Sequence, residues 1–212
     1  MAREKVLCGK EEIIRAAVRI VDSEGMEALS ARRISKELGV SAMTIYNYVE
    51  NLAEVKKYVL SDGFDRLYDS IYHALNELRG QVDKVKFCKT IAMQVFQFAS
   101  ENRNIFIFMF FEGRSQFRED AEIRPFYNFI AKLTKRSKAT QKDWAENAKA
   151  YVLLESYVIY EAYQACAGLS EVTKEQFSSM IDFLLEKCVT KERQSTKNRR
   201  RGKRILLTFN CQ

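Results

Sequence analysis

The chain has little proline and little glycine for its length. Its 212 residues include one proline and eight glycines, whereas a protein of many strands needs turn residues at short, regular intervals. This shortage disfavours a β-sandwich or barrel and favours long helices joined by short corners. Hydrophobic residues make up 47% of the chain and aromatic residues 12%, so the sequence can form a packed core and is not disordered throughout.

Cysteine and histidine are also scarce. The five cysteines stand at positions 8, 88, 166, 188 and 211, an odd number without a Cys-x-x-Cys pair. We therefore expect reduced thiols and neither a disulfide framework nor a zinc site. The single histidine, His73, has no neighbouring ligand cluster, so we expect it on a helix surface or in packing rather than at a metal or catalytic centre. No cofactor is predicted.

Long hydrophobic runs are missing as well. The most apolar stretch, IFIFMFF at residues 105–111, is far shorter than the ~20 residues that a membrane-spanning helix needs. The first residues, MAREKVLCGKEEIIRAA, contain no apolar segment of the kind found in secretory signals. The sequence predicts a soluble, cytoplasmic protein.

The net charge of +7 is unevenly distributed. Residues 187–212 hold nine Lys or Arg and one Glu, a net charge of +8, while residues 1–186 carry a net charge of −1. The basic balance therefore reflects the end of the chain, and it is weak evidence for a nucleic-acid partner. We expect residues 191–212 to form a disordered tail, with a phosphate-binding arm on NRRRGKR as the alternative.

Three helices are predicted within the first fifty residues. Apolar residues recur at helical spacing from Lys10 to Glu24, and Gly25 follows as a stop. Ser30 can cap a second helix, whose buried side contains Ile34 and Leu38.

Gly39 ends the second helix, and Ser41 can cap a third that carries Ile45 and Val49 on one stripe. Two helices joined by a tight glycine-containing corner form a helix-turn-helix, whose second helix enters the DNA major groove. The outer face of the third helix has none of the usual exposed charges. It offers small, hydroxyl, amide and aromatic groups that suit phosphates, base edges and thymine methyls: Ala42, Met43, Thr44, Tyr46, Asn47 and Tyr48. A plain helical corner that only packs is the alternative.

The rest of the chain is also predicted to be helical, so the fold class is all-α. Expected breaks fall at Gly80, ENRN, Gly113, Pro125 and LTKRSKAT. Capping-box patterns start the last two helices, residues 141–167 and 174–189, at Thr140/Asp143 and Thr173/Gln176. The expected organisation is a three-helix domain at 1–52, a larger helical domain at 53–190 and the tail at 191–212.

The first fifty residues resemble a known family. The segment IIRAAVRIVDSEGMEALSARRISKELGVSAMTIYNYVENLAEV is similar to the DNA-binding domain of TetR (tetracycline-repressor) family regulators. The matching features are the first helix with its GMEALS loop, the ARRISKELGVS helix and turn, and the TIYNYV recognition helix. The remainder of the chain matches that family only in size and helical character.

The resemblance implies a role for each matching position. It implies that Arg32 reaches a base, with a solvated surface charge as the alternative, since arginine reads guanine through two hydrogen bonds. It places Ala42, Met43 and Tyr46 at the groove and Thr44, Asn47 and Tyr48 at phosphates, with partial burial against the first helix as the alternative for Tyr48.

One position departs from the family. Members usually carry a phosphate-contacting lysine where this chain has Leu52, and Lys56 or Lys57 is the expected substitute. The region through Glu50 is near neutral, with eight basic and eight acidic residues, which predicts modest non-specific DNA affinity.

The resemblance also implies a homodimer through residues 141–167 and 174–189. The candidate stripes are Trp144, Ala148, Val152, Glu155 and Ile159, then Phe177, Ile181, Leu184 and Leu185; completion of the monomer core is the alternative. It implies a small-molecule pocket in the aromatic region 82–130, for which Met93, Phe96 and Phe110 are the expected lining residues. Aromatic walls suit an apolar or amphipathic effector, although aromatic stripes at helical spacing are more often core.

The expected function is a ligand-responsive DNA-binding regulator that acts as a repressor. It would bind a palindromic, double-stranded operator as a dimer and be released by its effector. The first alternative is a dimeric helical interaction module that no longer reads DNA, suggested by Leu52 and the neutral first domain. The second is an enzyme with an aromatic pocket, which the lack of a nucleophile–base arrangement and of metal-ligand spacing disfavours, so we expect no enzymatic activity.

Overall fold

The chain folds into helices throughout the part that the structure describes, which confirms the all-α prediction. The computed structural model describes residues 9–78, 84–117, 119–120 and 141–199, and their side chains except at 84, 114–115, 141–151 and 187–199. Within these ranges the elements are α1 (Lys10–Glu24), η1 (Met26–Ala28), α2 (Ala31–Leu38), α3 (Ala42–Ile45), α4 (Leu52–Asn76), α5 (Lys84–Glu101), α6 (Arg103–Ile107), η2 (Phe108–Glu112), α7 (Gly113–Phe117), α10 (Gln141–Cys166) and α11 (Lys174–Arg199).

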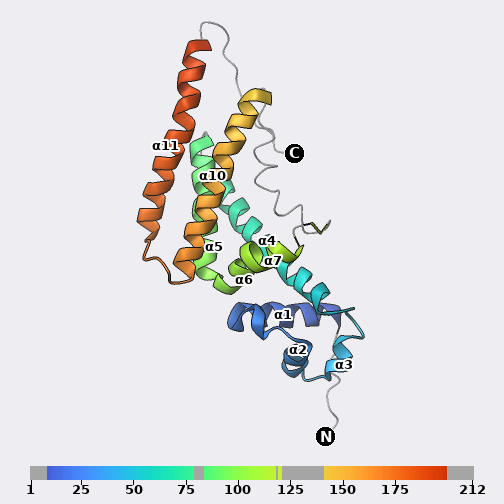
Figure 1. Cartoon of the computed structure of the whole chain (residues 1–212). Coiled ribbons are helices and arrows are strands. Elements are labelled where there is room, and N and C mark those ends of the chain that lie inside the picture. The colour runs from blue at the N-terminus through green and yellow to red at the C-terminus, as the bar shows by residue number, and fades with distance from the viewer. Residues whose placement is uncertain (1–8, 79–83, 118, 121–140, 200–212) are drawn as a thin grey trace.

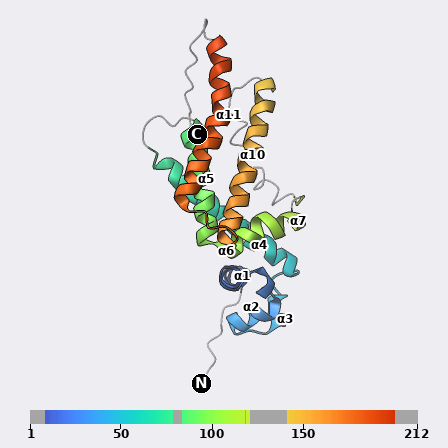
Figure 2. The same cartoon turned by 60° about the vertical axis from the view of Figure 1, so that its left-hand side comes forward.

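The helices form two parts joined by α4. Helices α1, α2 and α3 gather at the N-terminal end of the molecule, and α5, α10 and α11 run side by side away from them (Figure 1). α5 packs against α4, α10 and α11, so it is the central helix of the larger part. α6 lies between the two parts and contacts α1, as the rotated view also shows (Figure 2).

Local sequence signals account for the limits of the N-terminal helices. The Ser30 hydroxyl accepts from Arg33 N at 3.1 Å and begins α2, and the Ser41 hydroxyl accepts from Thr44 N at 3.2 Å and begins α3. Gly39 follows α2 with φ of 66°, in the left-handed region that glycine adopts without steric cost. These caps confirm the predicted turn between the second and third helices.

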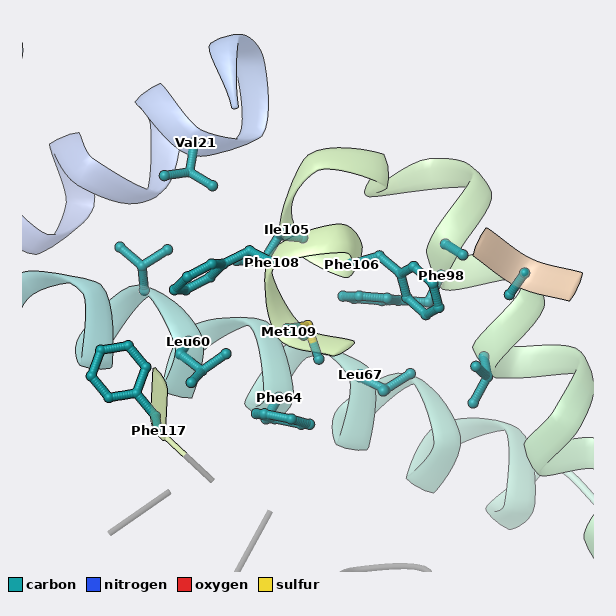
Figure 3. Close-up of a cluster of buried hydrophobic side chains, with 14 of the residues drawn as sticks. Val21, Leu60, Phe64, Leu67, Phe98, Ile105, Phe106, Phe108, Met109 and Phe117 are labelled. Carbon is teal, nitrogen blue, oxygen red and sulfur yellow. The ribbon is translucent and has the colours of Figure 1, made fainter. Parts of the chain in front are cut away.

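Buried aromatic and aliphatic side chains join the two parts. Figure 3 shows Val21 of α1 above a cluster that α4, α6 and η2 contribute, with Leu60, Phe64 and Leu67 along α4 facing Ile105, Phe106 and Met109. Each of these side chains is at most 3% exposed. The N-terminal helices therefore rest on a continuous core and not on a flexible connection.

Helix α6 continues into η2, a five-residue π-helical turn, and then into α7. An element boundary falls at Gly113 as predicted, since α7 begins there, but the glycine has helical angles and the helix continues through it. The wider turn explains the glycine, because a Cβ at position 113 would lie 2.8 Å from the Phe108 carbonyl oxygen. The predicted break at ENRN is confirmed, since α5 ends at Glu101 and α6 begins at Arg103.

Helix α11 is longer than predicted. Thr173 and Gln176 form the expected capping box, with Gln176 N donating to Thr173 Oγ1 at 3.2 Å and Thr173 N donating to Gln176 Oε1 at 2.9 Å. The helix then continues to Arg199, so its expected end at Val189 is wrong, and residues 190–199, which were assigned to the unfolded tail, are helical. Residues 190–199 contain no glycine or proline and are rich in Lys, Arg, Glu and Gln, which favour helix.

Several predictions fall on residues outside the described ranges. They are the breaks at Gly80, Pro125 and LTKRSKAT, the Thr140 capping box, and the part of the tail at 200–212. No helix in the described ranges is sufficiently long and apolar to span a membrane.

Candidate nucleic-acid interface

One flank of α2 is joined to α1 by a network of ion pairs. Arg33 bridges Glu24, through Nη2 and Oε1 at 2.5 Å, and Glu37, through Nη1 and Oε2 at 2.9 Å. Arg19 of α1 completes the network by donating to Glu37 at 3.0 Å. The hydrogen bonds from Arg33 lower the pKa of Glu24 below its ordinary value. These ion pairs connect α2 to α1, and the charged groups of this flank are paired within the domain.

The neighbouring flank of α2 is exposed to solvent. Arg32, the expected base-reading residue, is on this flank and has no ion pair among the described residues. Its position in the first turn of α2 leaves the guanidinium available to a ligand. Base reading and the alternative, a solvated surface charge, both agree with this exposure.

The recognition segment is shorter than predicted. Only Ala42–Ile45 is α-helical, and the chain continues in tight turns, with Asn47 N donating to Thr44 O at 3.2 Å and Tyr48 N to Ile45 O at 3.0 Å. The predicted stripe is nevertheless present, because Ile45 and Val49 are 1% and 4% exposed. Their burial fixes the segment on the domain core.

The outer face of this segment contains the side chains that were expected to meet DNA. Met43, Tyr46 and Tyr48 are exposed to 75%, 49% and 44%, and Asn47 is exposed as well. Ala42 and Thr44 are half-buried, and the Thr44 hydroxyl lies 2.8 Å from the Ser41 hydroxyl. At 44% exposure, Tyr48 is partly accessible to a ligand and partly covered by the protein. The face is uncharged, and its large side chains protrude.

The first turn of α4 does not offer a free cation. Leu52 is half-buried and packs against the core. The Glu54 carboxylate accepts from Glu50 N at 2.7 Å, and Lys10 of α1 lies 2.7 Å from its other oxygen. The hydrogen bond to Glu54, and a second to Tyr58, raise the pKa of Lys10. This end of α4 is therefore occupied by an internal ion pair.

The two proposed substitutes for the missing lysine differ. Lys57 is paired with Asp120, with Nζ and Oδ2 separated by 2.5 Å, so its charge is directed to the other part of the molecule. Lys56 is half-buried and has no ion pair among the described residues. Of these two lysines, Lys56 remains the candidate DNA contact.

A polar seam connects the N-terminal domain to the larger part. Arg66 of α4 donates from Nη1 to both Asp22 carboxylate oxygens, at 3.1 and 2.9 Å, and from Nη2 to the Asn102 side-chain oxygen. Asn104 Nδ2 donates to the Asp22 carbonyl at 3.0 Å. The end of α1 is thereby held to the corner between α5 and α6, a contact that local sequence patterns did not indicate.

The expected interface stripes divide between core and surface. On α11, Phe177, Ile181 and Leu185 are at most 2% exposed, so they complete the monomer core, which was the alternative. On α10, Val152 is 59% exposed, while Glu155 and Ile159 are half-buried. The side chains of Trp144 and Ala148 lie outside those described.

A second apolar face on these helices was, except for Val152, not predicted. It consists of side chains that are 44–70% exposed: Val152, Leu153 and Tyr160 on α10, and Met180 and Phe183 on α11. On α11, sequence periodicity pointed to the stripe that the monomer core uses. Residues 153 and 160, and residues 180 and 183, share helical faces by spacing alone, a signal that could have identified this face.

The expected effector-binding residues lie within the aromatic core of the larger part. Phe96 of α5 is 5% exposed and stacks on Phe177, with ring centroids 4.2 Å apart. Phe110 is half-buried, 5.8 Å from the Phe64 ring centroid, and Met93 packs against the same core. The structure brings these residues to one aromatic core without assigning them a ligand. No three His, Cys, Asp or Glu residues in the described ranges cluster to hold a metal ion.

Comparison with known proteins shows which proteins the N-terminal domain is similar to. Residues 13–50 match the family model described as bacterial regulatory proteins, tetR family. Among curated proteins, the chain is 44% identical over 45 residues to the HTH-type transcriptional repressor DrrR1 of Streptomyces coeruleorubidus, covering 21% of this chain and 17% of that protein. It is 27% identical over 90 residues to the uncharacterized HTH-type transcriptional regulator YobS of Bacillus subtilis, covering 42% and 45%. The matched stretches thus span less than half of either relative.

Solved structures extend the likeness to the whole fold. A TetR-like transcriptional regulator from Rhodococcus sp. RHA1 superposes with a TM-score of 0.63 at 13% identity, covering 85% of this chain and 95% of that one. The fatty acid degradation regulator FadR from Bacillus halodurans gives a TM-score of 0.61 at 18% identity, covering 87% and 96%. Residues 13–50 are therefore similar to the tetR family of bacterial regulatory proteins, and the described helices share the fold of these solved regulators.

Proposed function

We propose that the chain is a homodimeric transcriptional repressor that binds a palindromic operator and is released by a small apolar or amphipathic effector. The observation that carries this proposal is the outer face of the helix-turn-helix. Met43, Tyr46 and Asn47 protrude from a segment whose inner side is locked in the core, and Arg32 extends from α2 without an internal partner among the described residues. Such a face suits a major groove, where base edges and thymine methyls are accessible.

A dimer would follow from the exposed apolar face of α10 and α11. Large apolar side chains that gather on one surface usually mark an interaction site, and two-fold symmetric pairing is the commonest way to cover such a face. A two-fold dimer would present two recognition segments to half-sites about one DNA turn apart, ~34–36 Å. This spacing is why a palindromic operator belongs to the proposal.

The effector proposal rests on the aromatic composition of the larger part. Phe96, Phe110 and Met93 are candidates for the pocket wall, together with the neighbouring aromatic rings of α5, α6 and η2. Release requires that the effector favours a conformation that binds DNA less well. The match of residues 13–50 to a family of regulatory proteins also supports the expectation that the chain is not an enzyme.

Fluorescence anisotropy tests the DNA-binding proposal directly. The purified protein is titrated into labelled DNA from upstream of its own gene, and into a scrambled duplex, at about 150 mM salt. Tight binding to the native fragment alone is expected. Tyr46→Ala should abolish the preference, whereas Tyr72→Ala, which alters an exposed tyrosine of α4 outside the helix-turn-helix, should retain it.

Equal, weak binding of the wild type to both duplexes, unchanged in Tyr46→Ala, would contradict the proposal. Charge at the basic end of the chain would then account for the binding. The alternative function would be a dimeric interaction module, and size measurements on the same protein would still detect the dimer.

A further inference from the structure

Most of the basic side chains in the described part of the N-terminal domain form ion pairs within the fold. Residues 9–51 contain six of them, and four form ion pairs: Lys10 with Glu54, Arg15 with Glu11 and Glu12, Arg19 with Glu37, and Arg33 with Glu24 and Glu37. A cation already paired with a carboxylate contributes less to DNA phosphate binding than a free one, because the pair must first be broken.

The two remaining cations share one flank of α2. Arg32 and Lys36 are both exposed, and neither forms an ion pair or side-chain hydrogen bond with any residue that the structure describes. They are four residues apart, which places them on one helical face, one above the other. Lys36 is near enough to contribute to the lowered pKa of Glu24, for which Arg33 is the main cause.

The orientation of this flank follows from the ion pairs on the other one. Arg33 and Glu37 point toward Arg19 and Glu24 of α1, and Arg32 and Lys36 lie on the neighbouring flank, which is exposed to solvent. In a helix-turn-helix the first helix crosses the DNA backbone while the second enters the groove. Cations on the free flank of α2 are therefore the ones that phosphates would meet.

The first turn of α4 cannot supply a phosphate contact in place of Arg32 and Lys36. It has Leu52 packed on the core and a Glu54 carboxylate bound to Lys10. An approaching phosphate would meet a carboxylate there.

We propose that Lys36 contacts a DNA phosphate next to the base pair that Arg32 reads, and that it supplies the backbone contact that the first turn of α4 does not make. This inference rests on the proposed DNA-binding function and adds a contact residue to it. Lys36 binds through charge and carries no sequence information. Arg32 thus reads the base, and Lys36, one turn later in α2, positions the protein on the DNA backbone.

The test is the salt dependence of binding by the full-length chain. A high-affinity duplex is first selected from random DNA with the wild-type protein. Dissociation constants for Lys36→Gln are then measured by anisotropy between about 50 and 300 mM salt, on that duplex and on single-base variants. Neutralising one phosphate contact reduces the slope of log K against log salt by ~0.9, or ~1.8 for a symmetric dimer, and weakens binding ~5-fold per contact at about 150 mM. The loss should be equal on all duplexes.

Matched variants distinguish the loss of a phosphate contact from a general loss of positive charge and from a loss of stability. Arg15→Gln removes one charge from an ion-paired residue of the same domain. Lys86→Gln removes one charge from an exposed residue of α5. Both variants should keep the wild-type slope. Lys36→Arg should restore it. Urea unfolding of Lys36→Gln should match the wild type, because no described partner is lost.

Three outcomes would overturn the inference. An unchanged slope in Lys36→Gln would show that the residue does not reach phosphate. A loss confined to variants of one base pair would make Lys36 a base reader. If the wild type selects no duplex at all, the proposed DNA-binding function fails first, and the inference about Lys36 fails with it.

Discussion

Gly63 of α4 lies so close to Ile105 of α6 that a Cβ at position 63 would be 2.7 Å from Ile105 Cγ1. The same Cβ would be 2.8 Å from the Met109 sulfur, and both neighbours are fully buried. This crossing brings α4, which begins at the helix-turn-helix, into direct contact with the helix that supports α1. Glycine is therefore required here for its lack of a side chain, since the backbone is ordinary helix.

Replacing Gly63 with alanine should destabilise the protein. Overpacking a core site costs about 1–3 kcal/mol, and the better helix propensity of alanine offsets roughly 1 kcal/mol of that. We expect Gly63→Ala to lower the free energy of unfolding by about 1 kcal/mol in urea titrations. Combined with Met109→Ala, which removes the clashing sulfur, the glycine substitution should cost less than it does alone. Additive losses in the double variant would argue against a steric cause.

The Arg66 seam should control the local stability of α1. Arg66→Met keeps the aliphatic stem but removes the hydrogen bonds to Asp22 and Asn102. Because the Arg66 and Asp22 side chains are 32% and 37% exposed, solvent weakens the ion pair, and we expect a global loss of about 1 kcal/mol or less. Hydrogen exchange should nevertheless accelerate in the last turn of α1 relative to α2. Equal exchange in both helices would mean that the seam does not hold α1 in place.

The cap of the recognition segment should matter for DNA binding more than for global stability. Ser41→Ala removes the hydroxyl that accepts from Thr44 N and contacts the Thr44 hydroxyl. Since α3 has only one helical turn, losing a cap worth ~1 kcal/mol should loosen it and weaken operator binding about fivefold. Thr173→Ala, which removes the equivalent cap of α11, is the control. It should lower stability and leave DNA affinity unchanged.

Ion pairs between α1 and α2 should make stability depend on acidic pH. Arg33 holds the pKa of Glu24 below its ordinary value of 4.5. A carboxylate with a depressed pKa in the folded state stabilises the protein above about pH 4.5, and this stabilisation disappears as the pH falls through the folded-state pKa. The stability difference between wild type and Arg33→Gln should therefore be constant near neutrality and shrink below about pH 4.5. For Arg32→Gln, which lacks a described ion pair, urea unfolding across the same range should show no such change.

The sequence predicted the helix-turn-helix well because its determinants are local. Ser30, Gly39 and Ser41 act within four residues of where they stand, so a short window contains both the signal and its partner. The stripe of Ile34, Leu38 and Ile45 is likewise visible from spacing. What spacing did not show is which charges are free. Arg32 and Arg33 are adjacent in sequence, and only contacts with Glu24 and Glu37 distinguish the paired arginine from the exposed one.

The other differences between prediction and structure arise from contacts between residues that are far apart in the sequence. Lys57 was a candidate phosphate contact, but Asp120, far along the chain, is its partner. The π-helical turn at η2 and the role of Gly113 depend on a backbone distance, which residue type does not encode. On α11, one apolar stripe packs in the monomer and another faces outward, and periodicity cannot rank two stripes on the same helix.

The outward stripes lead to the prediction for the proposed dimer. Leu153→Glu on α10 and Phe183→Glu on α11 place a carboxylate on the exposed apolar face, where burial in an interface would desolvate it without a partner. Each variant should sediment as a monomer with unchanged helix content, while Tyr72→Glu, at a 65% exposed site on α4, should remain a dimer. Since one protomer reaches only one half-site, the monomeric variants should also lose most of their operator affinity. Dimeric sedimentation of both α10 and α11 variants would place the interface elsewhere, and operator binding by a monomer would contradict two-fold recognition.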